Sequence, residues 1–268
     1  MASSDSAASR RRAFVGRSRL WRDLGEIGLV ALAFLLYFVV RANVVDRPEA
    51  ALANARALVD VERGLGIYVE ASWQAWVLDA DLAVRFFNFV YFWLDFPLIA
   101  ALGLFLYFNR RRQYTLTRDA ILISGGLALI FYFALPVAPP RLLPETGVID
   151  TLQAFNNLSY QAQSTQFFVN PYAALPSLHV GWAFLIALGA AWAFPGNRLV
   201  LGLAGLHVTA QAASTVLTGN HYFLDGAAGI GVAALGLFGA LFMQRRGYAY
   251  LGRALGMAEG QSESAGRR

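Results

Sequence analysis

Six apolar runs, each close to the length of a bilayer crossing, constrain the fold of this chain more than any other feature. They cover residues 24–40, 86–108, 120–135, 178–194, 199–217 and 222–243. A membrane-spanning helix needs roughly 20 apolar residues because each residue adds only about 1.5 Å. Hydrophobic residues make up 57% of the 268 positions, which leaves little for a separate soluble domain. The sequence therefore predicts an all-α, polytopic membrane protein with a bundle of six transmembrane helices.

The arginines indicate on which side of the membrane each segment lies. All 22 basic residues are arginine, and sixteen lie in 1–23, 109–118, at 198 and in 244–268. Because basic residues concentrate in cytoplasmic loops, we expect residues 1–23 and 244–268 to be cytoplasmic tails flanking a membrane domain of residues 24–243. A signal peptide has the same charged-then-apolar order, but no small-residue cleavage site follows Val40, so we expect an uncleaved first span in a bacterial-type plasma membrane.

The segment between the first two runs, residues 46–81, differs from the spans. It is acidic on balance and places apolar residues at helical spacing, which predicts amphipathic helices lying on the outer face. The chain contains no cysteine, which excludes disulfides and thiolate metal sites. Since the arginines follow the topology, we expect membrane lipids as partners and no nucleic acid. The oligomeric state is left open.

Polar residues gather at the expected outer ends of the last spans. In "GNHYFLDGAAG", His221 and Asp225 are four positions apart and share one helix face. The carboxylate can accept from one imidazole nitrogen and leave the other as a nucleophile; the alternative is a structural histidine satisfied by a carboxylate. On the same side, "ALPSLHVGW" places His179 at the start of the fourth span, and the loop 136–175 contains Arg141.

The stretch "PSLH" has the features of an anion site. Pro176 fits the first turn of a helix, Ser177 can cap that helix or donate a hydrogen bond, and the exposed N–H groups there can bind phosphate. Arg141 can hold phosphate oxygens in a bidentate fork, although an arginine in a loop is more often only solvated.

Two further sets of polar residues lie within the spans. An intramembrane carboxylate is functional by default, so Asp95 is expected either to bind head-group hydroxyls or to pair with an arginine. His207 either lines a cleft or makes an interhelical hydrogen bond. The sets that share a helix face are His207, Gln211, Ser214 and Thr218, and Asn88, Tyr91 and Asp95.

"PSLH" followed about forty residues later by "HYFLD" resembles the type 2 phosphatidic acid phosphatase superfamily, whose motifs read PSGH and HxxxD. The resemblance covers residues 85–243. Leu178 in place of glycine and the aromatic "HYFLD" resemble the branch with the fungal inositol phosphorylceramide synthases and the sphingomyelin synthases, which are transferases. The resemblance implies that His221 is the nucleophile, Asp225 orients it, and His179 protonates the leaving group.

The chain departs from the superfamily pattern at three points. The chain has no lysine, Thr215 stands where the pattern has an arginine, and Leu142 follows Arg141 instead of proline. Fewer cations suit a phosphodiester, which carries one negative charge where a phosphomonoester carries up to two.

We therefore expect a lipid phosphotransferase that moves a phosphorylated head group, with phosphoinositol as the candidate, through a phosphohistidine. Ser177, Arg141 and Asp95 would bind substrate, and the scheme requires neither metal nor cofactor. The alternatives are a lipid phosphate phosphatase using the same site, and a transporter or scramblase in which the histidines relay protons.

Overall fold

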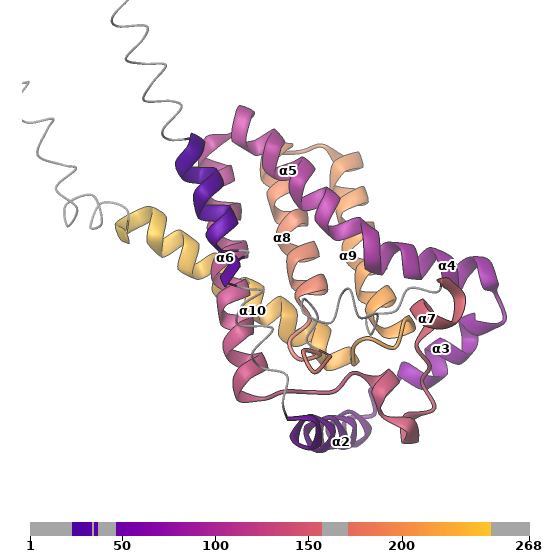
Figure 1. Ribbon diagram of the computed structural model, residues 1–268. Helices are drawn as coiled ribbons and strands as arrows, with labels where there is room; N and C mark the ends of the chain where they lie inside the picture. Colours follow the sequence, from indigo (N-terminus) through magenta and orange to yellow (C-terminus); the bar gives the residue numbers. More distant parts are fainter. Residues whose placement is uncertain (1–22, 34, 37–46, 157–170, 248–268) are drawn as a thin grey trace, which may run out of the picture. The chain divides into compact units, whose positions relative to one another are not determined.

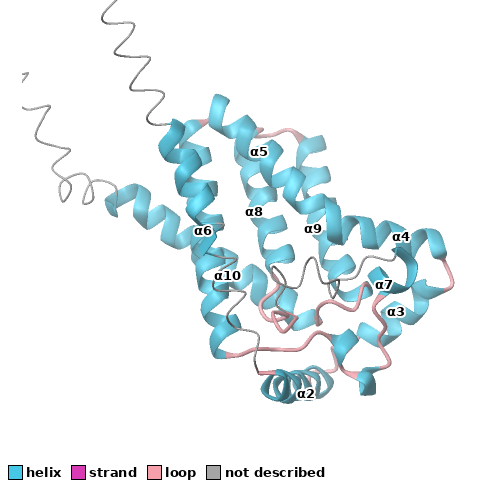
Figure 2. Ribbon diagram, viewed as in Figure 1, coloured by secondary structure: helices cyan, strands magenta, loops and turns pink. Residues whose placement is uncertain are grey.

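The computed structural model describes residues 23–33, 35–36, 47–156 and 171–247. Within these ranges the secondary structure is helical, apart from one isolated bridge between Val137 and Ala173 (Figure 2). The predicted all-α class is confirmed. The chain divides into a unit of residues 1–40, in which 23–33 and 35–36 are helical, and a unit of residues 41–268. The expected first span, 24–40, lies partly outside the described residues.

The second unit is built from nine α-helices joined by turns, counted over its described residues (Figure 1). In order they are α2 Pro48–Gly64, α3 Glu70–Leu78, α4 Asp81–Phe89, α5 Asp95–Asn109, α6 Arg111–Ala134, α7 Thr151–Asn156, α8 Leu178–Ala193, α9 Arg198–Leu217 and α10 Phe223–Phe242. A π-helical turn, η1 Val90–Leu94, joins α4 to α5, and another, η5 Met243–Gly247, follows α10. Two 3-10 turns, η2 Pro140–Leu142 and η3 Pro144–Thr146, follow α6.

Four helical stretches are long and apolar enough to cross a membrane. They are Asp81–Asn109, Arg111–Ala134, Arg198–Leu217 and Phe223–Gly247, and they make the chain an integral membrane protein. Helix α8 is equally apolar but has only 16 residues, which corresponds to about 24 Å. Apolar helices are thus found where the sequence predicts the last five spans, while the count of six spans stays a prediction.

Helix α6 begins nine residues before the third predicted span, 120–135. The sequence predicts that the second span stops at 109–114. In the structure, a single residue, Arg110, separates α5 from α6, which begins at Arg111. The Arg111 guanidinium lies 3.9 Å above the ring centre of Tyr107. Long basic side chains can cover apolar surface in this way while their charge stays near water, so the helix continues through a polar segment.

Helices α8 and α10 pack with their backbones in contact. A Cβ atom on Gly229 would lie 2.0 Å from the Ser177 carbonyl oxygen, and one on Gly181 would lie 2.6 Å from that of Gly229. Further along α10, a Cβ on Gly236 would lie 2.6 Å from the Ala120 carbonyl oxygen of α6. Small residues allow this approach inside membranes, where packing rather than hydrophobic burial holds helices together. The spacing between α8 and α10 is therefore fixed by main-chain contact.

Helices α2 and α3 cover the end of the bundle at which α6 ends and α8 and α10 begin (Figure 1). Ala51, Ala55 and Val59 of α2 pack in one apolar cluster with residues of the loop after α6 and with Tyr222. In α3, the buried Gln74 donates to the carbonyls of Ile149 and Leu217. Two helices are thus found within 46–81, while their amphipathic character and their place on the outer membrane face stay predictions.

Candidate active site

His221 lies in the turn before α10 and is buried. Its Nδ1 is 2.7 Å from the carbonyl oxygen of Ala174 and 3.3 Å from Oδ2 of Asp225. Carbonyl oxygens and carboxylates only accept, so Nδ1 must carry the hydrogen and Nε2 keeps its lone pair. The structure brings His221 and Asp225 together as their spacing predicts, but the carbonyl of Ala174 is the nearer partner.

Asp225 has a second contact that ties it to the start of α10. Its Oδ2 accepts from the backbone N–H of Tyr222 at 2.8 Å, and the side chain is fully buried. Its Oδ1 has no hydrogen-bond partner within the described ranges. One carboxylate therefore closes the first turn of α10 and holds the imidazole of His221 against it.

His179 lies at the start of α8 and faces His221. The two ring centres are 5.8 Å apart with an angle of 62° between the planes. His179 also stacks on Tyr91 of η1 with 4.3 Å between ring centres, and the Tyr91 ring lies 6.3 Å from that of His221. Tyr91 was expected only to share a face with Asn88 and Asp95, and its contact with His179 was not predicted. The Tyr91 ring fixes the orientation of the His179 ring beside His221.

Ser177 joins the starts of α8 and α10. Its backbone N–H donates to the carbonyl of Asp225 at 2.9 Å. Of the two roles expected for its hydroxyl, the cap is not formed: Ser177 is the residue before α8 but makes no side-chain cap, and its buried Oγ has no hydrogen-bond partner among the residues described. The hydroxyl can donate to a ligand, next to first-turn N–H groups that have no acceptor within their own helix.

Arg141, in η2, is anchored beside the turn that carries His221. Its Nη1 donates to Oδ1 of Asn220, the residue before His221, and its backbone N–H donates to Gly219 at 3.1 Å. Its Nε lies 3.2 Å from a carboxylate oxygen of Asp150. The structure thus brings Arg141 to the segment that carries His221. Asn220 was not singled out from the sequence.

Thr215 has a structural place in the turn. Its carbonyl accepts from the backbone N–H groups of Asn220 at 3.2 Å and His221 at 3.0 Å. The turn also requires Gly219, which has φ +73° and whose Cβ would lie 2.6 Å from the Ile149 carbonyl oxygen. The hydroxyl of Thr215 donates to Ala212 within α9. At the position where the superfamily pattern has an arginine, this chain has a residue that shapes the turn.

Two carboxyl groups from outside the bundle bind the first turn of α10. Glu70 Oε1 accepts from Phe223 N–H at 2.8 Å, and Glu62 Oε1 accepts from Leu224 N–H at 2.7 Å. Both glutamates are fully buried. Burial, followed by the nearby carboxylates of Glu70 and Asp225, raises the pKa of Glu62 to about 8, although the bond from Leu224 N–H opposes the shift. Glu62 is therefore mostly neutral at pH 7.

Comparison with known proteins identifies the family. The PAP2 superfamily matches residues 56–238, which run from within α2 to within α10. The chain belongs to the PAP2 superfamily. It is therefore an enzyme, a membrane phosphatase or phosphotransferase.

A solved structure and the curated proteins add little to this assignment. The chain is similar to the crystal structure of Aquifex aeolicus LpxE, with 16% identity over 60% of this chain and 84% of that one and a TM-score of 0.44. No curated protein shows significant sequence similarity to the chain.

Inside the spans of this PAP2 protein, the polar faces predicted from the sequence are buried. Asp95 meets His207, with 3.2 Å between a carboxylate oxygen and Nε2, so the alternative of an arginine partner is wrong. Asn88 donates to the carbonyl of Thr151 and to the side chain of Asn156. Three neighbours along the same segment are buried as His207 is: Gln211 and Ser214 of α9, and Thr218, the residue after it.

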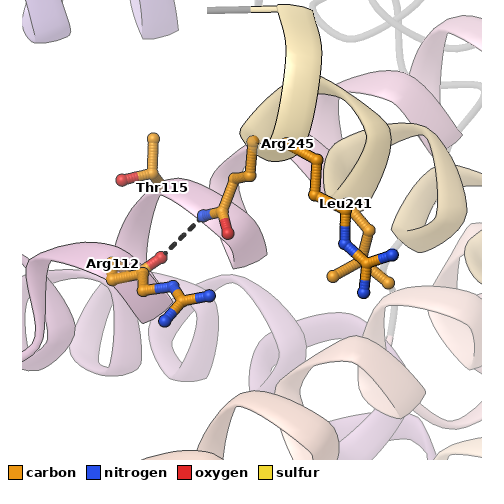
Figure 3. Close-up of a pocket in the computed structure, with 5 residues that line it drawn as sticks. Arg112, Thr115, Leu241 and Arg245 are labelled. Atoms are coloured by element: carbon orange, nitrogen blue, oxygen red, sulfur yellow. Dashed lines mark hydrogen bonds between the residues drawn. The ribbon is translucent and has the colours of Figure 1, made fainter.

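A cavity of about 410 Å³ lies far from the histidines of the PAP2 protein. It is lined by Arg112, Thr115, Leu241, Gln244 and Arg245 (Figure 3). These residues belong to the start of α6, the end of α10 and η5, whereas His221 precedes α10. Because α10 has 20 residues, about 30 Å separates its two ends. In the described residues no group of three or more His, Asp or Glu side chains is arranged to hold a metal ion.

Proposed function

We propose that the protein transfers a phosphorylated polar head group from one membrane lipid to a hydroxyl of another, through a phosphohistidine on His221. The observation that carries this proposal is the contact of His221 Nδ1 with two acceptors, which leaves Nε2 as the nucleophile. His179 lies on the adjacent helix with its ring 5.8 Å from that of His221.

In the first step, Nε2 of His221 attacks the phosphorus of the donor lipid. An N–P bond forms, the bond from phosphorus to the lipid oxygen breaks, and His179 gives a proton to that oxygen. Asp225 and the Ala174 carbonyl hold Nδ1–H and stabilise the positive charge that develops on the ring. Arg141, Ser177 and the first-turn N–H groups of α8 stabilise the charge on the other phosphoryl oxygens.

In the second step, His179 takes a proton from the acceptor hydroxyl. The acceptor oxygen attacks phosphorus, the N–P bond breaks, and its electron pair returns to Nε2 of His221. The acid of the first step is the base of the second, so the enzyme returns to its starting protonation state.

The number of cations supports a diester donor. Arg141 is held next to His221 by Asn220, while Thr215 takes the position of the second arginine and bonds within its own helix. A singly charged diester needs fewer cationic partners than a monoester. Hydrolysis is the second candidate, because membership of the PAP2 superfamily supports a lipid phosphatase at least as well.

The topology belongs to the same proposal. Six spans with both termini in the cytoplasm would put His221, α2 and α3 on the extracytoplasmic face, in line with the arginine distribution. In this cysteine-free chain, Asp79→Cys next to α3 should react with an impermeant thiol reagent in intact cells, whereas Asn109→Cys at the end of α5 should be protected. The opposite labelling pattern would invert the topology.

The decisive experiment incubates the purified protein with phosphatidylinositol labelled in its head group and a membrane lipid extract. We expect a new labelled lipid in the mass spectrum, and a phosphorylated protein intermediate that is labile to acid and stable to base. Both should be absent for a His221→Ala variant that keeps the wild-type melting temperature.

Two outcomes would contradict the proposal in different ways. Release of inorganic phosphate from phosphatidic acid or a polyprenyl phosphate, with no labelled lipid product, would make the protein a phosphatase. Full turnover by a folded His221→Ala variant would exclude the phosphohistidine itself.

A further inference from the structure

Three polar side chains are buried between α5 and α9, within the apolar part of the bundle. Asp95 is 3% exposed, His207 8% and Gln211 0%. Asp95 and His207 lie 3.2 Å apart, and Gln211 follows His207 by about one helical turn on the same face. Polar and ionisable groups at this depth are costly, so their presence requires a compensating interaction.

The protein supplies only part of that interaction, the contact between Asp95 Oδ1 and His207 Nε2. The second carboxylate oxygen of Asp95, Nδ1 of His207, and the amide oxygen and nitrogen of Gln211 have no hydrogen-bond partner in the part of the chain that the structure describes. An unsatisfied buried polar group costs about 1–3 kcal/mol, and folded proteins contain few of them. Four such atoms in one place indicate a site that is completed by a ligand or by water.

Asp95, His207 and Gln211 are connected to His179 through Tyr91 and the turn that contains it. Tyr91, which stacks on His179, lies in the π-helical turn that ends immediately before Asp95. The same turn packs against α9, the helix that carries His207 and Gln211. π-Helical turns inside α-helices often mark functional sites, since the extra residue re-aims the side chains that follow. Asp95 therefore lies about one turn along the same helical stretch from the ring that holds His179.

The chemistry of the three side chains selects the kind of ligand. Asp95 and His207 are an acid and a base in contact, so the pair attracts neither anions nor cations strongly. Carboxylate oxygens accept from hydroxyl groups, an amide both donates and accepts, and an imidazole can do either. A metal ion does not fit, because the described residues place no third His, Asp or Glu beside this pair. These groups match the adjacent hydroxyls of a neutral polyol.

We propose that Asp95, His207 and Gln211 form a subsite that binds the hydroxyl groups of the head group while its phosphate lies at His221. This inference rests on the proposed function and narrows its substrate class to lipids whose head group is a polyol with adjacent hydroxyls, such as a glycerol, sugar or cyclitol. Arg141 recognises the phosphate, and the buried subsite distinguishes polyols from head groups without hydroxyls.

The test compares two diester lipids that differ in their hydroxyl groups. Phosphatidylglycerol has a vicinal diol and phosphatidylethanol has none, while both carry one negative charge. Donor consumption by the purified full-length protein gives kcat and KM for each. We expect Gln211→Leu and Asp95→Asn to raise KM for phosphatidylglycerol roughly tenfold and to leave KM for phosphatidylethanol unchanged. Leucine removes the hydrogen-bonding amide, and asparagine replaces a carboxylate oxygen that accepts from the diol by an NH2 group that cannot accept. KM for phosphatidylinositol should rise in the same variants as KM for phosphatidylglycerol does.

Thr209→Val is the matched control for these variants. Thr209 lies on the same helix as Gln211 but is exposed, and its hydroxyl donates to the Gly205 carbonyl. Thr209→Val should leave kcat and KM unchanged for both donor lipids. Equal loss for the two donors in Gln211→Leu and Asp95→Asn would assign the three residues a structural role and overturn the subsite.

A binding measurement separates this inference from the proposed function. If the wild-type protein consumes neither donor, the proposed function fails, and the subsite is judged from lipid binding to His221→Ala by native mass spectrometry. Selective retention of phosphatidylglycerol over phosphatidylethanol, lost in His221→Ala/Gln211→Leu, supports the subsite. Equal retention of the two lipids would mean that water alone occupies it.

Discussion

Replacement of Glu62 by glutamine should remove a pH dependence from the stability of the folded protein. Glu62 accepts from Leu224 N–H at the start of α10, and burial raises the pKa of its carboxyl to about 8 from an ordinary 4.5. Between these values the folded state keeps a proton that the unfolded chain has lost. A rise in pH through this interval therefore favours the unfolded chain, and the loss of stability is complete above the folded pKa.

The size of the effect follows from the two pKa values. Each pH unit between about 4.5 and 8 lowers the free energy of unfolding by at most ~1.4 kcal/mol, which gives an upper limit of about 5 kcal/mol. Relaxation of the surrounding structure around an ionised Glu62 reduces this to on the order of 2–3 kcal/mol. Glutamine keeps an oxygen that accepts from Leu224 N–H but does not titrate, so Glu62→Gln should match the wild type near pH 5 and exceed it near pH 8.

Thermal unfolding of the purified protein, followed by tryptophan fluorescence from pH 5 to pH 8.5, measures the difference. At pH 8 we expect the variant to melt roughly 5 °C higher than the wild type. Asp60→Asn is the control, since Asp60 lies on the same helix and is exposed; it should retain the wild-type slope. A Glu62→Gln protein whose melting temperature falls with pH as steeply as that of the wild type would refute the reasoning.

Three further predictions test the site and the packing that holds it. His221→Ala should lower turnover by on the order of 10³-fold or more without unfolding the protein, measured as the rate of lipid consumption beside the melting temperature. Arg141→Lys should lower kcat/KM about 10- to 100-fold in the same assay, because it keeps the charge but loses the fork that also donates to Asn220. Gly229→Ala should destabilise by about 3 kcal/mol, since its Cβ would lie 2.0 Å from the Ser177 carbonyl oxygen. Gly231→Ala, with nothing within 4 Å, should instead stabilise by roughly 0.5–1 kcal/mol in a denaturation curve.

The sequence predicted the helices well because the signal for them is local. Runs of apolar residues and the arginines at their ends are features of adjacent positions, and α8, α9 and α10 begin within a residue of the expected starts. The motif residues were predicted in the same way: His221 and Asp225 belong to one helix, and the stretch that starts at Pro176 begins another. The start of α6 was missed because arginine side chains tolerate helix as readily as a loop when an aromatic ring lies beside them.

The contacts that complete the site could not be read from the sequence, because their partners are distant along the chain. Glu62 and Glu70 reach α10 across 162 and 153 residues, and on an amphipathic helix a glutamate that faces inward looks the same as one that faces water. Asn220 pairs with Arg141 across 79 residues, and Tyr91 was one aromatic residue among several in its segment. Their roles depend on tertiary packing, which residue type and spacing do not encode.

The main-chain contact between α8 and α10 restricts substitutions at some positions of this molecule and leaves others free to change. His179 and His221 lie at the starts of two helices whose backbones touch at Gly181 and Gly229, and this main-chain contact restrains the distance between the two rings. His207 and Gln211, on the buried polar face of α9, lie outside this contact. Under the proposed function, exchanges at these two positions would therefore change the lipid preference while the contact that positions the two histidines is kept.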